Sequence, residues 1–234
     1  MKKLTYATRD IISKYEGKGF NLNDYIPYDE QNEKDCIDIV THNGYELEFV
    51  KDQTYKICKA AIDRQPYAIR FVKEQTPELC ELAVKDHADA LEFIKDECKT
   101  KKICLMAVRK DGLALKYIPN PDYEIYLEAI QQNGESIKYI DNPTKEMQLA
   151  AVSNTPLAIR YIQCPFEEVV LEAIINDPRA LKYIKTQTEK ICLIAILYNP
   201  TAIEYVENKT QILCETAMRV ASQKKIDIFR YIAN

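Results

Sequence analysis

Cysteine is the residue type in this 234-residue chain best suited to chemistry, and it occurs eight times. Thiolates bind zinc, form disulfides or act as nucleophiles, and each use requires its own spacing and neighbours. Six cysteines recur in the same local pattern: Cys36, Cys58, Cys80, Cys104, Cys192 and Cys214. The sequence has no Cys-x-x-Cys pair and no Cys/His cluster with zinc-site spacing. Where the cysteine is missing, Tyr126, Gln148 or Val170 takes its place, which indicates a packing position.

The remaining candidates for chemistry are few. Cys98 and Cys164 fall outside the recurring pattern, and we expect them in loops, where a thiol is easier to reach. The two histidines, His42 and His87, are expected in turns, with no serine or carboxylate paired to them by the pattern. No glycine-rich phosphate loop is present. We therefore expect no catalytic residue, no metal site and no cofactor, and we predict that the chain is not an enzyme.

Composition narrows the class of protein further. The formal net charge is -4, so no overall positive field attracts nucleic acid or anionic lipid. Only five glycines occur, which argues against a turn-rich all-β fold. The N-terminal segment lacks an apolar stretch of signal-peptide length, and the longest apolar run, near residues 191–198, is too short to span a membrane. We expect a soluble protein of the cytoplasm, or of the host cytoplasm or virion if it is viral, with reduced thiols.

The cysteines belong to an internal repeat. An alanine anchors each unit, and the anchors are 22 residues apart except for one interval of 24: Ala61, Ala83, Ala107, Ala129, Ala151, Ala173, Ala195 and Ala217. Ile39 takes this place in a first, less regular unit. Aliphatic residues one after and four before the anchor form one stripe of a helix. Seven before the anchor stands a residue that caps helices: Asn32, Thr54, Thr76, Thr100, Asp122, Thr144, Thr188 or Thr210, with Phe166 as the exception.

A second start signal follows each first helix. It is a polar residue followed by Pro or Gly, as in "QP" at 65–66, "DG" at 111–112, "NG" at 133–134, "TP" at 155–156, "DP" at 177–178 and "NP" at 199–200. Each unit therefore predicts a helix of about ten residues, a tight turn and a helix of about eight. Helices this short are marginal alone, so each unit must bury its apolar stripe against its neighbours.

The predicted fold is all-α: a right-handed α-solenoid of about nine 22-residue helix-turn-helix repeats. The repeat array spans residues 32–234, and its last unit is irregular. Residues 1–31 do not fit the repeat and are predicted to form an N-terminal helical cap.

Units such as "LCELAVKDHADALEFI" and "ICLMAVRKDGLALKYI" resemble the helical repeats of domain-of-unknown-function family 4116 over roughly residues 32–220. Such repeats are common in giant DNA viruses and occur in some bacteria. The resemblance implies an architecture and a viral origin, and it implies no activity, cofactor or catalytic residue.

Two surfaces are candidates for binding a partner. The first is a basic ladder, defined by the residue nine after the anchor in four consecutive units: Lys116, Lys138, Arg160 and Lys182. A tyrosine follows each, and we expect these tyrosines in the core. The ladder would grip an acidic peptide or a phosphate chain. It needs no ligand to exist, since like charges about 10 Å apart in water repel by only about 0.4 kcal/mol, and a solvated face is the alternative.

The second surface is an apolar patch formed by Ile175, Leu197 and Tyr198, where earlier units carry charged residues. The irregular C-terminal segment, with Ile226, Ile228 and Phe229, is expected to fold over it, and a protein partner or a second copy of the chain is the alternative. The leading hypothesis is a non-enzymatic scaffold that binds a protein. The alternative is a solenoid that binds single-stranded nucleic acid through the basic ladder, which the net charge disfavours. Partner identity, oligomeric state and the face that binds stay open.

Overall fold

The structure, a computed structural model, describes residues 31–228 and residue 231, and in this part it contains helices and no strands. The predicted N-terminal cap lies outside the described residues apart from Gln31. The α-helices are α2 (Glu33–His42), α3 (Tyr55–Arg64), α4 (Pro77–Asp86), α5 (Lys101–Lys110), α6 (Tyr123–Gln132), α7 (Lys145–Asn154), α8 (Glu167–Asn176), α9 (Glu189–Tyr198) and α10 (Gln211–Lys224). This confirms the all-α repeat fold, while the right-handed sense stays a prediction. No described helix combines the length and the apolarity that a membrane crossing requires.

The second helix of each unit is shorter and tighter than the sequence predicted. Each is a six-residue 3-10 helix: η2 (Gly44–Phe49), η3 (Pro66–Phe71), η4 (Ala88–Phe93), η6 (Gly112–Tyr117), η7 (Gly134–Tyr139), η8 (Pro156–Tyr161), η9 (Pro178–Tyr183) and η10 (Pro200–Tyr205). The buried aliphatic residues in these segments, such as Ile69 and Val72, are three apart, which matches the three residues per turn of a 3-10 helix. The two extra residues in the 24-residue interval accompany a short 3-10 turn, η5 (Asp96–Cys98).

The predicted caps are confirmed with one exception. Seven cap side chains accept a hydrogen bond from the amide three residues on: Asn32, Thr76, Thr100, Asp122, Thr144, Thr188 and Thr210. The hydroxyl of Thr54 instead donates to the Glu33 carboxylate at 2.8 Å, so it joins two repeats rather than capping its own helix. Phe166 starts α8 without a side-chain cap, as predicted.

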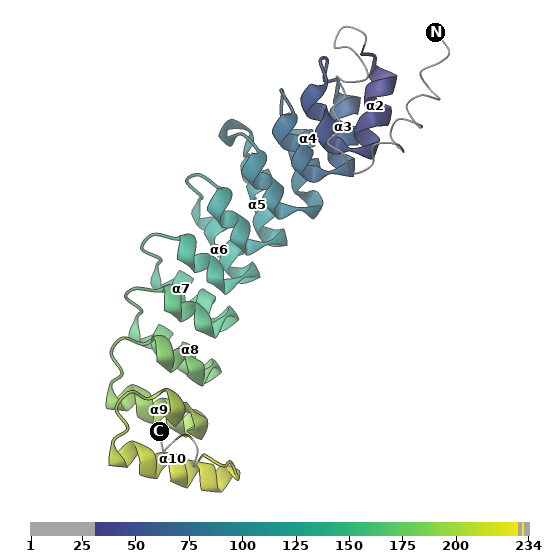
Figure 1. Ribbon diagram of the computed structural model, residues 1–234. Coiled ribbons are helices and arrows are strands. Elements are labelled where there is room, and N and C mark those ends of the chain that lie inside the picture. The colour runs from purple at the N-terminus through teal and green to yellow at the C-terminus, as the bar shows by residue number, and fades with distance from the viewer. Residues whose placement is uncertain (1–30, 229–230, 232–234) are drawn as a thin grey trace. The chain divides into compact units, whose positions relative to one another are not determined.

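The helices form two compact units, the first ending at Asn120 and the second beginning at Pro121. Within each unit, consecutive α-helices contact one another, and so do consecutive 3-10 helices (Figure 1). All eight anchor alanines are completely buried. Their small side chains let neighbouring helices approach closely, so each repeat covers the apolar stripe of the next.

Glycine serves the same close approach at the first position of η7. A Cβ atom on Gly134 would lie 2.3 Å from the carbonyl oxygen of Ala151 and 2.8 Å from Cβ of Thr155, both in the next repeat. A methyl group at Gly134 would therefore push the next repeat away. Gly44 occupies the same place against Ala61, where the added Cβ would lie 2.5 Å from the carbonyl oxygen.

We expect Ala129→Phe to lower the free energy of unfolding by at least about 1–3 kcal/mol, because the fully buried anchor of α6 leaves no room for a ring. Gln131→Phe is the matched control, since it places the same aromatic ring at an exposed position of the same helix. Thermal unfolding followed by circular dichroism compares the two variants. Equal melting temperatures would refute close packing at the anchor.

Candidate functional site

The recurring cysteines lie in the core. Cys36, Cys58, Cys80, Cys104 and Cys192 are buried, and Cys214 is half-buried. Burial raises the pKa of Cys58 to about 11 and that of Cys80 to about 12, so these thiols stay protonated at neutral pH. The described residues contain no disulfide and no group of three or more side chains that could hold a metal ion. This burial fits the packing role inferred from the sequence.

The two cysteines outside the pattern differ from each other. Cys164 is exposed in the loop between η8 and α8. Cys98 is half-buried at the end of η5, and its thiol donates to the carbonyl of Gln75 at 3.3 Å. Cys164 is therefore the more accessible thiol of the pair.

Three of the basic-ladder residues are exposed on consecutive 3-10 helices of the second unit: Lys138 on η7, Arg160 on η8 and Lys182 on η9. Lys138 and Arg160 meet at one aromatic ring, since Lys138 Nζ lies 5.5 Å and Arg160 Cζ 4.7 Å from the centroid of Tyr161. These distances fall within the range of a cation–π contact. Lys116 lies in the first unit, where its Nζ is 4.5 Å from the ring of Tyr117.

The central cation of the ladder is neutralised by an acid from the preceding repeat. Arg160 Nη2 lies 2.6 Å from Glu135 Oε1, and the hydroxyl of Tyr161 donates to the other carboxylate oxygen at 3.4 Å. The pKa of the Arg160 guanidinium is raised by its hydrogen bond to Tyr161 and by the Glu135 charge. Arg160 is therefore committed to contacts within the chain.

The expectation that the ladder tyrosines are core residues is wrong. Tyr139 and Tyr183 are 37% exposed, and Tyr117 and Tyr161 are half-buried. The physical reason is the 3-10 geometry, which turns the aliphatic neighbours inward and leaves the ring near the surface. The cation of the same helix lies over the rings of Tyr117, Tyr139 and Tyr161. Arg70 shows the same arrangement in the first unit, with Cζ 5.4 Å from the ring of Phe71 on its own helix and 4.6 Å from the ring of Phe93 on the next 3-10 helix.

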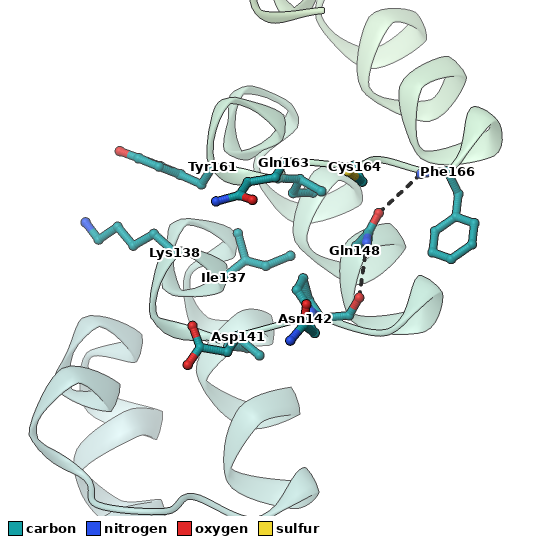
Figure 2. A pocket seen from close by; sticks show the side chains of 12 residues that line it. Ile137, Lys138, Asp141, Asn142, Gln148, Tyr161, Gln163, Cys164 and Phe166 are labelled. Atoms are coloured by element: carbon teal, nitrogen blue, oxygen red, sulfur yellow. Dashed lines mark hydrogen bonds between the residues drawn. The ribbon is translucent and has the colours of Figure 1, made fainter. Parts of the chain in front are cut away.

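Two open grooves lie beside the ladder in the second unit. The Pro143 groove has a volume of about 610 Å³ and is lined by residues that include Ile137, Lys138, Pro143, Tyr161 and Gln163 (Figure 2). The Pro165 groove has a volume of about 720 Å³ and is lined by residues that include Arg160, Ile162, Pro165, Tyr183 and Lys185. Tyr161, Ile162 and Gln163 line both grooves, so the grooves are neighbours along the stack.

A buried glutamine forms one wall of the Pro143 groove. Gln148 Nε2 donates to the carbonyl of Pro143 at 3.1 Å, and Gln148 Oε1 accepts from the amide of Phe166 at 3.3 Å (Figure 2). It thereby ties together the loops that precede α7 and α8. From the repeat pattern alone, Gln148 was recognisable only as a replacement for cysteine, and the groove residues Pro143, Pro165 and Gln163 were not predicted. The sequence signal that could have indicated the grooves is the proline eight residues before the anchor.

The apolar patch is uncovered where the sequence predicted a cover. Leu197 is 49% and Tyr198 56% exposed, and Ile175 is half-buried. Of the residues expected to cover it, Ile228 is buried, Ile226 is exposed, and Phe229 lies outside the described residues. Lys224 of α10 does reach this end of α9, where Nζ donates to the carbonyls of Leu197 at 3.4 Å and Tyr198 at 2.7 Å. Lys224 thus supplies a hydrogen-bond donor to the last carbonyls of α9 and leaves the side chains of Leu197 and Tyr198 exposed.

The fold and this surface define a helical-repeat protein. A family model described as a domain of unknown function (DUF4116) matches residues 76–121, which hold the α4–η4 and α5–η6 repeats. The resemblance inferred from the repeat motif is therefore confirmed for this segment. No curated protein and no solved structure matches the chain significantly.

The double substitution Lys138→Glu with Arg160→Glu should leave the helical circular-dichroism signal unchanged, since both side chains are exposed. The free energy of unfolding should fall by no more than about 2 kcal/mol, because exposed ion pairs and cation–π contacts contribute little. The corresponding double substitution to Gln is the control that removes attraction without adding repulsion. A large loss of helicity in either variant would mean that these positions are buried.

In the folded protein at pH 8, a maleimide or Ellman's reagent should modify Cys164 first. Cys58 and Cys80 should react only on unfolding, because their thiols are buried and their raised pKa values lie above this pH. Peptide mass spectrometry after timed quenching measures the order, and Cys164→Ser should remove the fast phase. Equal rates for Cys80 and Cys164 in the native state would contradict the burial.

Proposed function

We propose that this chain is a non-enzymatic scaffold that binds a protein partner along the 3-10 side of its second unit. The observation that carries the proposal is the pair of adjoining grooves at Pro143 and Pro165. Helical-repeat proteins bind partners on surfaces that successive repeats build together.

The composition of this surface supports a protein as the partner. Tyrosine and arginine are enriched in protein–protein interfaces, and here Tyr161, Tyr183 and Arg160 line the grooves. The aliphatic side chains of Ile162 and Ile184 line the Pro165 groove. A partner segment lying there would bury apolar surface between polar rims, which is the usual anatomy of an interface.

Binding of single-stranded nucleic acid is the weaker interpretation. A phosphate chain needs free cations that release counterions on binding. Arg160 is paired with Glu135, and Lys138 lies against two tyrosine rings. The formal net charge of the chain is -4, which opposes a polyanion at long range.

An enzymatic role has no support in the described residues. Catalytic cysteines need a lowered pKa. In the described part of the chain, every thiol with a displaced pKa is displaced upward by burial, which makes it a poorer nucleophile.

Site-specific photo-crosslinking tests the proposal. A photoreactive amino acid at Gln163, exposed in both grooves, should capture a protein from lysate of the cells that make the chain, identified by mass spectrometry. The same amino acid at Gln131, exposed on α6, is the control and should not capture that protein. Capture should survive nuclease treatment and moderate salt. Cross-links to RNA, with affinity that falls steeply with salt, would overturn the proposal.

A further inference from the structure

In four repeats of this chain, the residue eight before the anchor is a glutamine. We call this place the bridge position, and we call the glutamine a glutamine bridge because its side chain bonds to the backbone of two repeats. These glutamines are Gln31, Gln53, Gln75 and Gln187. In the best-formed case, Gln75 Nε2 donates to the carbonyl of Ile69 at 3.0 Å and to that of Phe93 at 2.9 Å. Gln75 Oε1 accepts from the amide of Lys95 at 2.8 Å. One carboxamide thus joins the 3-10 helices of two successive repeats.

The same three contacts recur in other repeats. Gln53 donates to the carbonyls of Leu47 and Phe71 at 2.9 Å each and accepts from the amide of Lys73 at 2.9 Å. Gln187 makes the corresponding bonds at 2.9, 3.1 and 3.0 Å. The repeat backbone therefore offers a fixed site for a primary carboxamide: two acceptors and one donor.

Proline stands at this position in three repeats of the second unit, at Pro121, Pro143 and Pro165, and grooves lie at the last two. Its ring cannot reach the site or make these hydrogen bonds. The backbone of the site is nevertheless retained, because the loop before α8 has the same sequence of bends as the loop before α4. At Pro165 the equivalent groups are the carbonyls of Ile159 and Tyr183 and the amide of Lys185.

These groups are left without the partner that glutamine supplies elsewhere. Within the described residues, the Tyr183 carbonyl and the Lys185 amide have no hydrogen-bond partner. The same is true of the Tyr161 carbonyl and the Gln163 amide beside Pro143. Both pairs of residues line the grooves described above.

In the four repeats compared, the groove beside a proline at the bridge position is larger than the groove beside a glutamine. The grooves at Pro143 and Pro165 hold about 610 and 720 Å³, whereas those at Gln53 and Gln187 hold about 360 and 110 Å³. The smaller grooves are lined by the glutamine and by no residue of a 3-10 helix. The larger grooves reach the 3-10 helices, where Tyr161 forms part of the wall of both. They therefore border the elements whose carbonyls the bridging glutamine contacts in other repeats.

From this we infer that the Pro143 and Pro165 grooves bind glutamine side chains of an extended peptide, each carboxamide replacing the missing bridge. The inference rests on the proposed protein-binding function and names the chemistry of the partner. Successive helices lie about 8–10 Å apart. A peptide in the polyproline II conformation advances about 3.1 Å per residue and has three residues per turn, so side chains three residues apart point to the same face. Glutamines three residues apart in such a peptide therefore match neighbouring grooves.

The chain itself shows why the ligand is a carboxamide rather than an ammonium group. Lysine takes the bridge position in two repeats, as Lys99 and Lys209, and each Nζ donates to one carbonyl: that of Tyr117 at 2.8 Å and that of Tyr231 at 3.0 Å. Beside Lys99, the residue that would supply the amide donor is Pro119, which has no N–H. At Lys99 the side chain therefore needs no acceptor. At Gln163 and Lys185 the N–H is present, so the ligand must both donate and accept. A carboxylate would set its negative charge against two carbonyl oxygens.

Fluorescence anisotropy with the full chain tests this. The probe is a labelled peptide with two glutamines separated by two alanines, and the control peptide has glutamate in their place. The glutamate peptide should bind at least about tenfold more weakly, because a site built for hydrogen bonds rejects a ligand that leaves them unpaired. Equal affinity for the two peptides would overturn the inference.

Protein variants supply the matched comparison. Pro143→Gln with Pro165→Gln should rebuild the bridges, raise the melting temperature and weaken binding of the glutamine peptide at least about tenfold. Pro143→Ala with Pro165→Ala leaves the sites open and should bind as the parent does. Circular dichroism checks that both variants fold. Unchanged binding by the glutamine variant would refute the assigned site.

Nuclear magnetic resonance gives a direct readout of the site. The amide signals of Gln163 and Lys185 should shift on titration with the glutamine peptide, while that of Lys95, already bonded to Gln75, should not. If the cross-linked protein is still captured by the Pro143→Gln, Pro165→Gln variant, the scaffold proposal stands and the glutamine inference falls. If the parent chain captures no protein but still binds the glutamine peptide, the glutamine inference stands and the scaffold proposal falls.

Discussion

Close contact between helices too short to stand alone is the constraint on which the rest of this structure depends. Within each unit, the fully buried anchor alanines bring each α-helix against the next, and Gly44 and Gly134 admit the following repeat at the turn. Isolated helices of this length are marginal in water, so their stability comes from neighbours. Recurring caps at the first turn set where each helix begins. Any surface feature of the chain is consequently shared between at least two repeats.

A second line of contact, the glutamine bridge, decides which repeats are closed on their 3-10 side. A carboxamide can satisfy acceptors and a donor at once, which makes it suited to joining backbone groups of two repeats. Where proline replaces it, the packing of the α-helices continues unchanged but the loop backbone is left open to solvent. The grooves of the second unit thus accompany the replacement of glutamine by proline at the bridge position, which leaves the hydrophobic core unchanged.

Charge plays a smaller part in this surface than the row of basic residues indicates. Arg160 pairs with Glu135 and shares the ring of Tyr161 with Lys138, so two neighbouring cations are held by the repeat itself. In the first unit Arg70 lies over the ring of Phe71 on its own helix and over that of Phe93 on the next. Covering a half-exposed aromatic ring with the cation of its own helix is thus a device of the repeat. What distinguishes the second unit is backbone polar groups that no glutamine side chain covers, for which a ligand must offer matched hydrogen bonds rather than net charge.

The sequence by itself determined the repeat, the anchors, the extent of each first helix and all but one of its side-chain caps, because these depend on residues within a single unit. It predicted an α-helix where a 3-10 helix forms, since a segment of six to eight residues with apolar spacings of three and four suits both. It also placed the ladder tyrosines in the core. Only the tertiary structure decided the grooves. The meaning of Gln75 or Pro165 appears once two neighbouring repeats bring their carbonyls and an amide to one point, and those groups are 6–20 residues distant along the chain.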